Sequence, residues 1–557
     1  MAIVCYIVTT MYVDKAFSKQ NGKTYVRYLL RTSFRENGNV KHKNIANISH
    51  CTDDEIQAIK LALKHKGDLS HLGSYKGKIS SKQGLSIGAI VLLKALSERL
   101  HITKALGNSV MGKQALWQIM ARVIDQGSRL SAVRLAAQHG ICDLINLDSF
   151  NEDDLYKNLD WLSDNQEKIE GSLFKSRCLA VPRLFLYDVT SSYLEGKENE
   201  LSDWGYNRDG KKGKRQIVIG LLTDGEGLPV SVEVFKGNTN DTSTFLNQVR
   251  KLTLRFRVKE VTVVGDRGMI KSTQIEQLNA ENFNYITAIT KPQIETLLNN
   301  KVIQLELFNE KICEIEDGGV RYILRKNPMR VEELQQSRRE KLDRVKEMTA
   351  KKNTNLENHP RARDTVAGRK IEELVAKLKL NDFVSVELKG RKLSLNIDDT
   401  KMTEKTILDG CYVIKTGLKK EEVSGETVHE RYKDLALVEQ GFRTMKTGFL
   451  ETRPIFVRKE KRTRGHVLVV MLAYMLVREL KKLWLELNLT VEEGIAELST
   501  ISSVEIKVGE VLYHQIPHPR ELGENLLKLA NVNLPEVLPC RNINVATRRK
   551  LQSRRNL

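Results

Sequence analysis

The sequence lacks the features of exported or disulfide-stabilised proteins. Its 557 residues contain only seven cysteines, which are scattered, odd in number and never in a Cys-x-x-Cys pair. This distribution argues against both disulfides and a structural zinc site. The N-terminal Met-Ala-Ile-Val-Cys-Tyr lacks a basic segment followed by an apolar core and a small-residue cleavage site, so we expect a cytoplasmic protein.

Long hydrophobic runs are also missing, and acidic residues are in deficit. The longest apolar run, Val467–Val477, ends at Arg478 and is shorter than the roughly 20 residues that span a bilayer. We therefore predict a buried helix there and no membrane partner. Lys and Arg number 90 against 70 Asp and Glu, a net charge of +20. This excess favours a polyanionic partner, with nucleic acid as the leading candidate, because cations that neutralise phosphates release condensed counterions.

The character of the sequence changes several times, as expected of a chain too long for one hydrophobic core. Alternating residues near the N-terminus, with a polar turn at Asn37-Gly38, predict a β-hairpin. Helical apolar spacing follows, and the helices either recognise a DNA end or form a structural bundle. We predict a β-rich N-terminal module over 1–80, a helical domain over 81–180, a catalytic core over 181–290 and 421–487, an inserted subdomain over 291–420, and a C-terminal region over 488–557 with a basic tail.

Strand-like runs define the predicted core. Five of them begin at Arg183, Gln216, Leu228, Val261 and Tyr285. Asp224-Gly225-Glu226-Gly227 is a tight hairpin signal, and the helical stretch Ser243–Leu254 predicts a crossover back into the sheet. The fold class is therefore α/β, with the outline of an RNase H-like core: a mixed sheet of three meandering strands, a helix and a further strand. Charged helices over Val331–Lys352 and Arg369–Leu380, with strands at Lys392 and Cys411, belong to the inserted subdomain.

Two aspartates are candidates for chemistry. Asp188 and Asp266 each lie near the end of an apolar strand-like run, where a carboxylate costs free energy unless it is paired or bound to a metal. A single strand-end Asp more commonly starts a turn. Two such positions in one sheet favour a shared site.

A third carboxylate, Glu439, lies on a helix predicted over Glu430–Lys446. Residues seven apart differ by only about 20° around a helix, so Tyr432, Glu439 and Lys446 share one stripe, with Arg443 beside it. Alternatively, Glu439 and Arg443 form an ordinary surface ion pair. The neighbouring apolar face can hold the helix on the sheet and consists of Leu437, Val438, Phe442 and Met445.

Three converging carboxylates suit Mg²⁺ or Mn²⁺, which prefer oxygen ligands. Two such ions about 3.5–4 Å apart can activate a water or a DNA 3′-hydroxyl and stabilise the leaving oxygen in an in-line displacement at phosphorus. The predicted metal ligands and catalytic residues are Asp188, Asp266 and Glu439. Tyr432, Arg443 and Lys446 would then hold the phosphates that flank the cut.

The order of these residues resembles a known family. The contexts Leu-Tyr-Asp-Val-Thr-Ser and Val-Val-Gly-Asp-Arg-Gly-Met, the long insertion before the glutamate and the Tyr-x6-Glu-x6-Lys segment are similar to insertion-sequence DDE transposases. The similarity is to the insertion-sequence-four-like branch with the signature Tyr-x2-Arg-x3-Glu-x6-Lys, although Leu435 stands at its Arg position. The resemblance covers roughly 180–480. It implies cut-and-paste transposition by a synaptic homodimer acting on terminal inverted repeats and target DNA.

Two basic segments are further candidates for DNA contact. The loop Trp204–Arg215 mixes aromatic and basic side chains that could stack on bases and hold phosphates; the alternative is a solvated hairpin loop. Its candidate residues are Trp204, Arg208, Lys211, Lys212, Lys214 and Arg215. Residues 453–464 contain Arg453, Arg458, Arg462 and Arg464, with Glu460 as the one acidic residue. We predict that His466 is a packed histidine and not a ligand.

Two other functions remain open on the sequence alone. One is an RNase H-like nuclease or resolvase without strand transfer, against which the additional N-terminal domains and the inserted subdomain count. The other is a catalytically silent DNA-binding protein derived from a transposase, against which the intact acidic trio counts.

Overall fold

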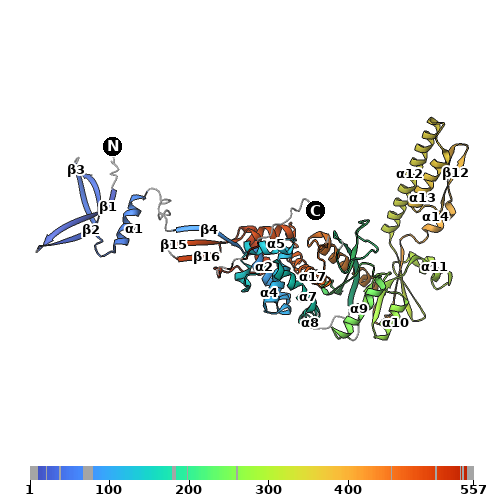
Figure 1. Ribbon diagram of the computed structural model, residues 1–557, viewed down its shortest axis with the longest axis horizontal. Helices are drawn as coiled ribbons and strands as arrows, with labels where there is room; N and C mark the ends of the chain where they lie inside the picture. Colours follow the sequence, from blue (N-terminus) through green and yellow to red (C-terminus); the bar gives the residue numbers. More distant parts are fainter. Residues whose placement is uncertain are drawn as a thin grey trace, which may run out of the picture. The chain divides into compact units, whose positions relative to one another are not determined.

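The computed structural model describes residues 10–20, 22–36, 39–66, 79–177, 184–196, 198–258, 261–452, 455–508, 511–539, 541, 543 and 545–547. Three of the predicted features, the turn at Asn37-Gly38, Arg453 and the basic tail from Arg548 onward, lie outside these residues. The chain divides into two compact units (Figure 1). The first comprises Met1–Leu85, Ser502–His518 and Pro535–Cys540, and the second comprises Ser86–Ile501, Pro519–Leu534 and Arg541–Leu557.

The first unit contains two antiparallel three-stranded sheets. One is a meander of β1 (Thr10–Gln20), β2 (Lys23–Glu36) and β3 (Asn39–Asn47), which confirms the predicted hairpin as the β2–β3 pair. Helix α1 (Asp53–Lys64) follows and begins with a capping box between Thr52 and Glu55 that satisfies free backbone N–H groups. The second sheet has the order β16 (Val511–Gln515), β15 (Ser502–Val508), β4 (Ile79–Ser86).

The second unit begins with a cluster of helices. Helix α17 (Glu460–Leu483) packs against α4 (Val110–Ile124) and α7 (Glu152–Asp164). The apolar run Val467–Val477 forms the fully buried middle of α17, as predicted. Among the described residues, no helix is both long and apolar enough to cross a membrane. The other helices of this cluster are α2 (Gly88–Arg99), α3 (Ile102–Leu106), α5 (Arg129–Gln138), α6 (Ile141–Ile145), α8 (Gln166–Arg177), α18 (Val491–Ser499) and α19 (Glu521–Leu529).

A mixed eight-stranded sheet forms the rest of the second unit, in the order β10-β11-β14-β9-β8-β5-β6-β7. The five predicted core strands are all present: β5 (Leu184–Tyr193), β6 (Gln216–Asp224), β7 (Pro229–Lys236), β8 (Thr262–Gly265) and β9 (Asn284–Ala288). Strands β5, β6 and β7 form an antiparallel meander, whereas β8 runs parallel to both β5 and β9. The predicted crossover is helix α9 (Asp241–Leu254), which joins β7 to β8.

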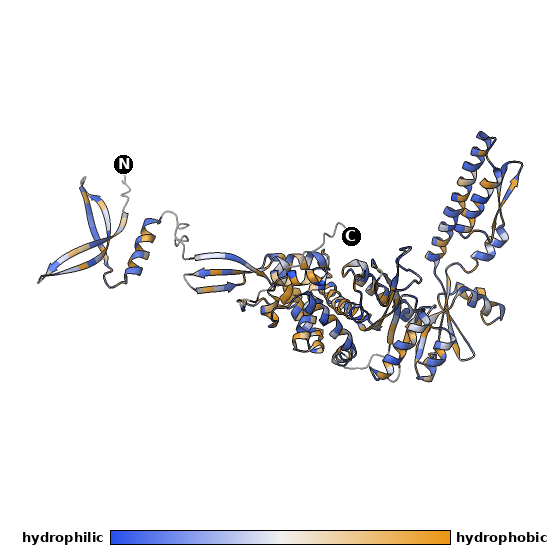
Figure 2. Ribbon diagram, viewed as in Figure 1, coloured by the Kyte–Doolittle hydropathy of each residue, from blue (hydrophilic) through white to orange (hydrophobic). Residues whose placement is uncertain are grey.

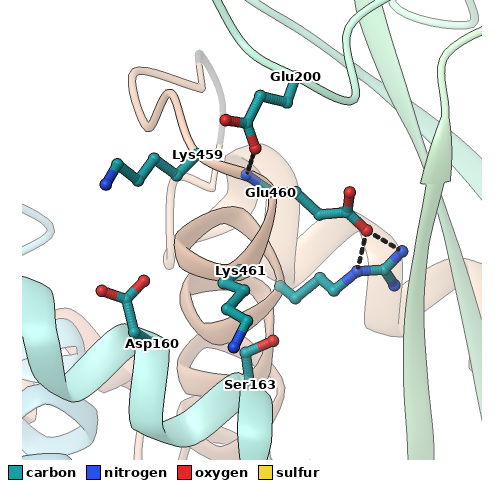
Figure 3. A pocket seen from close by; sticks show the side chains of 7 residues that line it. Asp160, Ser163, Glu200, Lys459, Glu460 and Lys461 are labelled. Atoms are coloured by element: carbon teal, nitrogen blue, oxygen red, sulfur yellow. Dashed lines mark hydrogen bonds and ion pairs between the residues drawn. The ribbon is translucent and has the colours of Figure 1, made fainter.

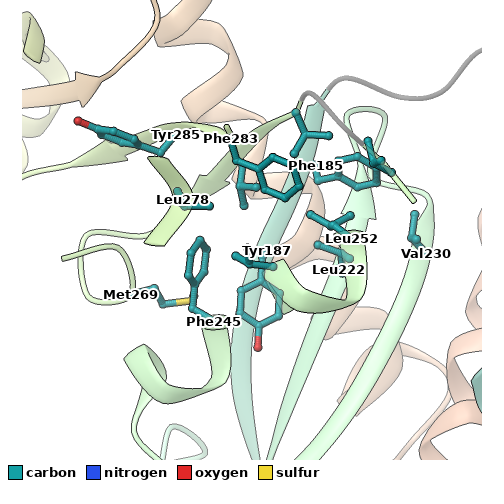
Figure 4. Packing of buried hydrophobic residues seen from close by; sticks show 14 of the residues in the cluster. Phe185, Tyr187, Leu222, Val230, Phe245, Leu252, Met269, Leu278, Phe283 and Tyr285 are labelled. Carbon is teal, nitrogen blue, oxygen red and sulfur yellow. The ribbon is translucent and has the colours of Figure 1, made fainter. Parts of the chain in front are cut away.

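Alternation along β5 decides which side chains enter the core. Phe185, Tyr187 and Val189 point into a hydrophobic cluster with Phe245 of α9 and Leu278 of α10 (Ser272–Ala280) (Figure 4). Because successive side chains of a strand point to opposite faces, the residues between them, Asp188 included, lie on the other face of the sheet.

Residues 291–420 both extend this sheet and form a separate cluster. Strands β10 (Cys313–Asp317), β11 (Val320–Lys326) and β14 (Cys411–Thr416) continue the sheet beyond β9. A second hydrophobic cluster, which includes Val345 and Ile371, joins α12 (Pro328–Asn358), α13 (Asp364–Lys377), β12 (Val384–Lys389) and β13 (Lys392–Ile397). The residues of α12 are mainly hydrophilic (Figure 2). The sheet therefore continues past the boundary expected at 290. Helix α11 (Lys291–Asn299) and the 3-10 helix η2 (Leu305–Asn309) pack on this extension, whereas α14 (Asp399–Thr406) packs on the α12–α13 cluster through Met402.

Close packing of α17 on α7 leads to a stability prediction. A Cβ added at Gly465 would lie 2.1 Å from the backbone oxygen of Leu159, whereas a Cβ at Gly171 in α8 would meet nothing within 4 Å. We expect Gly465→Ala to lower the free energy of unfolding by roughly 1–3 kcal/mol through overpacking. Gly171→Ala, the matched control, should raise it by about 0.5–1 kcal/mol through helix propensity. Urea unfolding of both variants measures the two effects, and a Gly465→Ala protein as stable as the wild type would contradict the packing described.

Candidate active site

The register between β5 and β8 places two aspartates at one level of the sheet. The parallel pairing runs from Leu184↔Thr262 to Tyr187↔Gly265, and the next residue on each strand is Asp188 and Asp266. Strand β8 ends there, whereas β5 continues to Tyr193, paired with β6. The sequence predicted that Asp188 lies near the end of its strand, but Asp188 lies within β5. It is the first residue of β5 beyond the end of β8.

Glu439 reaches this edge from a helix that packs on β5. Helix α16 (Leu435–Arg443) contacts β5 and β6 through a buried side that includes Val438 and Phe442. Met445, just beyond it, is also buried, and Leu437 packs on the β6–β7 turn at Gly227. The apolar face predicted for this segment is thus the face that holds it on the sheet. Glu439 lies on the exposed side of the same helix.

The electrostatics of Asp188 show that the three carboxylates share one neighbourhood. Burial, together with the charges of Asp266 and Glu439, raises the pKa of Asp188 to about 7. The N–H of Val189, which donates to Asp188 Oδ1 at 2.7 Å, and the guanidinium of Arg208 act in the opposite direction. Like charges close together and removal from water both disfavour the ionised carboxylate. A bound cation would favour it.

Tyr432 joins the same site through Asp266. It lies near the end of α15 (Gly425–Lys433), and its hydroxyl donates to Asp266 Oδ1 at 3.4 Å. Burial and the charges of Asp266 and Glu439 raise the pKa of Tyr432, so the phenol stays protonated and can donate. Arg267, the residue after Asp266, lowers this pKa; it was not among the predicted site residues, although its position beside Asp266 is a signal in the sequence.

The helix predicted over Glu430–Lys446 is not continuous, and this changes the position of Lys446. Helix α15 ends at Lys433, α16 begins at Leu435, and a π-helical turn covers Thr444–Gly448. A π-turn contains more residues than an α-turn and changes the direction of the side chains within and after it, so Lys446 does not share the predicted stripe with Glu439. Lys446 is only 9% exposed, whereas Glu439 is exposed.

Lys446 instead makes a buried ion pair. Its Nζ lies 2.6 Å from Asp209 Oδ1, and it donates to Thr190 Oγ1 at 2.9 Å. The Asp209 side chain is only 1% exposed and also accepts from the N–H of Tyr193. Asp209 was missed from the sequence because it lies in a basic loop and its partner is far along the chain.

Two other positions of this segment differ in exposure. Leu435, where the family signature has Arg, is buried, so no cation occupies that position. Arg443, beside Glu439, is exposed.

The loop Trp204–Arg215 has a fixed base and an exposed surface. Its base is held by backbone hydrogen bonds between Asp203 and Gln216, at 3.0 and 3.1 Å. Trp204 is 57% and Tyr206 is 83% exposed. Several of the predicted cations have partners within the protein: Arg208 with Asp241, Lys214 with Glu195, Arg215 over the ring of Trp204 and Lys211 over the ring of Tyr193; Lys212 is exposed.

The basic segment that precedes and begins α17 is neutralised by acids from elsewhere in the chain. Arg458 pairs with Glu198, Lys461 with Asp164 and Arg462 with Asp160, and Arg464 pairs with both Glu460 and Glu233. The adjoining pocket is lined by Asp160, Ser163, Glu200, Lys459, Glu460, Lys461 and Arg464 (Figure 3). The view of Glu460 as the one acid among these cations is therefore wrong in three dimensions. His466 is buried and bonds Arg129 at 2.8 Å, which confirms it as a packed histidine.

A cleft of about 620 Å³ leads away from Asp266 and Tyr432. Residues of α11, α12 and the segment after α13 line it, and its charge is predominantly positive. Asp409 is its one acid besides Asp266 and pairs with Lys291 and Arg338. The cations that line the cleft are Arg267, Lys291, Arg330, Arg338, Lys341, Lys379 and Lys405.

Comparison with known proteins identifies the family. Residues 180–476 match the family described as transposase DDE domain, and this match covers more than half of the chain, so the chain belongs to the DDE transposases. Residues 13–71 match the family described as IS1634 family transposase, N-terminal domain. The protein is thus a DNA transposase of the insertion-sequence type, an enzyme that cleaves DNA and transfers strands, as the resemblance predicted.

Two further comparisons complete this result. No curated protein matches the chain. Among solved structures, a chain of the piggyBac transposase synaptic complex with hairpin DNA is similar at 10% identity and a TM-score of 0.33, over 81% of this chain and 82% of that chain.

The buried pair of Lys446 and Asp209 gives the second prediction. Lys446→Ala should lower the free energy of unfolding by about 3–5 kcal/mol, because it leaves the Asp209 carboxylate buried without this cation. Arg443→Ala, which removes an exposed cation nearby, should change it by less than about 0.5 kcal/mol. Denaturant unfolding measures both. If Lys446→Ala were as mild as Arg443→Ala, the ion pair would have no structural role.

The raised pKa of Asp188 gives the third prediction, on stability against pH. Its value of about 7 exceeds the ordinary 3.8, so between these values the folded state binds more protons than the unfolded state and stability falls as pH rises. Asp188→Asn should therefore raise the Tm at pH 8 but change it much less at pH 4, where the folded carboxyl is protonated and only the unfolded one is partly ionised. Thermal unfolding in EDTA across this range tests it. An equal effect of the substitution at both pH values would contradict the assignment.

Proposed function

We propose that Asp188, Asp266 and Glu439 are the catalytic carboxylates of this transposase, on a core of RNase H-like topology. The observation that carries the proposal is the parallel register that ends at Tyr187↔Gly265, which brings Asp188 and Asp266 to one level. The strand order β7-β6-β5-β8-β9, with the first three strands antiparallel and β8 and β9 parallel to β5, supports the RNase H-like assignment.

The donor set fits hard divalent cations. Carboxylate oxygens are the ligands that Mg²⁺ and Mn²⁺ prefer. Burial first, and then the charges of Asp266 and Glu439, raise the pKa of Asp188, and a bound cation would relieve this repulsion. Among the described residues, no three His, Cys, Asp or Glu side chains are gathered closely enough to hold a metal ion. Two ions held by Asp188, Asp266 and Glu439 would supply the activation of the nucleophile and the stabilisation of the leaving oxygen.

The residues around the trio orient it. The Tyr432 hydroxyl donates to Asp266, which restricts the rotation of that carboxylate, and the backbone N–H of Val189 does the same for Asp188. Arg208, held by Asp241 and by the Oγ of Ser191, places a cation near Asp188. Fixed partners of this kind reduce the reorganisation needed when the reaction begins.

The basic cleft beside Asp266 is the proposed path of a DNA strand that enters or leaves the site. It begins at catalytic residues and is lined by cations of the core and of α12, which suits contact with successive phosphates. An element has two ends, and each chain contains one proposed site, so we propose that a homodimer holds the two terminal repeats together. Arg443 and the exposed surface of the Trp204–Arg215 loop are further proposed contacts with DNA.

The experiment separates chemistry from binding. Asp266→Ala and Glu439→Ala should each abolish Mg²⁺-dependent cleavage of a supercoiled donor plasmid carrying the element, with affinity for its end in EDTA unchanged, since binding rests on cationic contacts. Mg²⁺ should raise the Tm of the wild type but not of Asp266→Ala, because an ion that binds only the folded state stabilises it. An Asp266→Ala protein that still cleaves would place the site elsewhere.

Variants of the cleft should show the reverse pattern. Lys341→Gln should weaken binding of the end and reduce the slope of log K against log salt by about 0.9, one phosphate contact. Lys352→Gln, on the same helix α12 but outside the residues that line the cleft, is the matched control.

The cleavage assay also tests strand transfer. Cleavage without joining of the cut end to a target plasmid would favour a nuclease without strand transfer.

A further inference from the structure

The two faces of the β1–β2–β3 sheet carry different chemistry. Lys15 lies over the rings of Phe17 and Tyr28, and Lys60 of α1 also lies over Tyr28. Helix α1 therefore covers the face that carries Tyr28. Residues paired across strands share a face, and neighbours along a strand alternate, so Met11, Val13 and Leu30 belong to this helix-covered face.

The opposite face carries arginine, amide, imidazole and phenol groups. Arg27, Arg31 and Arg35 recur along β2 on this face, beside Tyr12 of β1 and His42 and Asn44 of β3. Two hydrogen bonds confirm that these side chains lie together: Tyr12 Oη bonds His42 Nδ1 at 2.8 Å, and Arg31 donates to Asn44 Oδ1 at 2.7 Å. Arg27 and Arg35 are exposed.

Four lysines of this sheet, Lys15, Lys19, Lys41 and Lys43, are on the other face, and only Lys23, at the start of β2, shares the arginine face. The concentration of arginine on one face indicates the ligand. Lys15, Lys19 and Lys43 alternate with the apolar residues of the helix-covered face. Guanidinium and amide groups form paired hydrogen bonds of fixed planar geometry with the edges of guanine and adenine, whereas a lysine ammonium is a compact charge without that geometry. A face that concentrates the first kind of group is suited to reading bases.

We infer that the face bearing Arg27, Arg31 and Arg35 reads base sequence in the major groove of duplex DNA. Strands can occupy this groove, which is about 12 Å wide. At about 3.4 Å per residue, Arg27 to Arg35 spans roughly 27 Å, the length of about eight base pairs. Arg31 is oriented by Asp14 on one side and Asn44 on the other. It is therefore held in place before DNA binds.

The sequence analysis named the helical domain as a candidate for recognition of a DNA end; this inference assigns that role to the N-terminal module instead. The inference can be tested separately from the catalytic trio, because it concerns DNA binding in the absence of metal. The full-length protein in EDTA is first used to enrich binders from a duplex DNA library with a random core. The enriched duplex and a scrambled duplex then become the probes.

Substitution of the arginines should remove sequence preference more than affinity for DNA in general. Each of Arg27→Ala, Arg31→Ala and Arg35→Ala should lower the ratio of affinities for enriched over scrambled duplex by roughly 10- to 100-fold. Arg27→Lys and Arg35→Lys keep the charge, so they should lose most of that preference while the salt slope stays near the wild-type value. Lys43→Ala, an exposed cation on the helix-covered face, is the matched control and should leave the ratio unchanged.

Three outcomes would overturn the inference. One is an unchanged preference in all the arginine variants whose circular dichroism matches the wild type, which would move recognition to another part of the chain. Another is an equal loss of preference in Lys43→Ala. The third is equal affinity for an RNA duplex of the same sequence, because the major groove of A-form RNA is too deep and narrow for these side chains to read.

Discussion

The candidate active site depends on the parallel pairing of β5 with β8. Because Tyr187 is opposite Gly265, the residues after them are at the same level, and both are aspartates. A register shift of one residue would turn Asp188 toward the core occupied by Tyr187, since side chains alternate between the faces of a strand. The hydrophobic cluster of Phe185, Tyr187 and Val189 with α9 and α10 therefore fixes the register that the chemistry requires.

The same arrangement accounts for the electrostatics of the site. The sheet leaves Asp188 half-buried, and the end of β8 leaves Asp266 exposed, so two identical side chains experience different surroundings. Burial and like charge both disfavour the ionised form of Asp188, which a divalent cation would reverse. The neighbouring pair of Asp209 and Lys446 has the opposite character, because each buried charge is already compensated, and its contribution is to hold the loop and the π-turn against β5.

The excess of positive charge is distributed between three different surroundings. At the start of α17 it is balanced by acids from α7 and from the segment after β5. In the cleft beside Asp266, seven cations line the walls against two acids, and four of these cations pair with Asp409, Glu333 or Asp382. The excess that remains there suits phosphate. On the β1–β2–β3 sheet, Arg27, Arg31 and Arg35 share one face with Lys23, and the other four lysines lie on the opposite face. Net charge alone indicates a polyanionic partner, but these surroundings decide which cations are available to it.

The sequence by itself determined the strands of the core, the buried helix at Val467–Val477 and the candidate residues Asp188 and Asp266, because these depend on local apolar runs and on residue order. It also carried the resemblance to DDE transposases. Only the tertiary structure decided that Asp209 neutralises Lys446, that a π-turn ends the common helical stripe and that distant acids neutralise the segment around Arg462. Such pairings join residues hundreds of positions apart, and local periodicity contains no information about them.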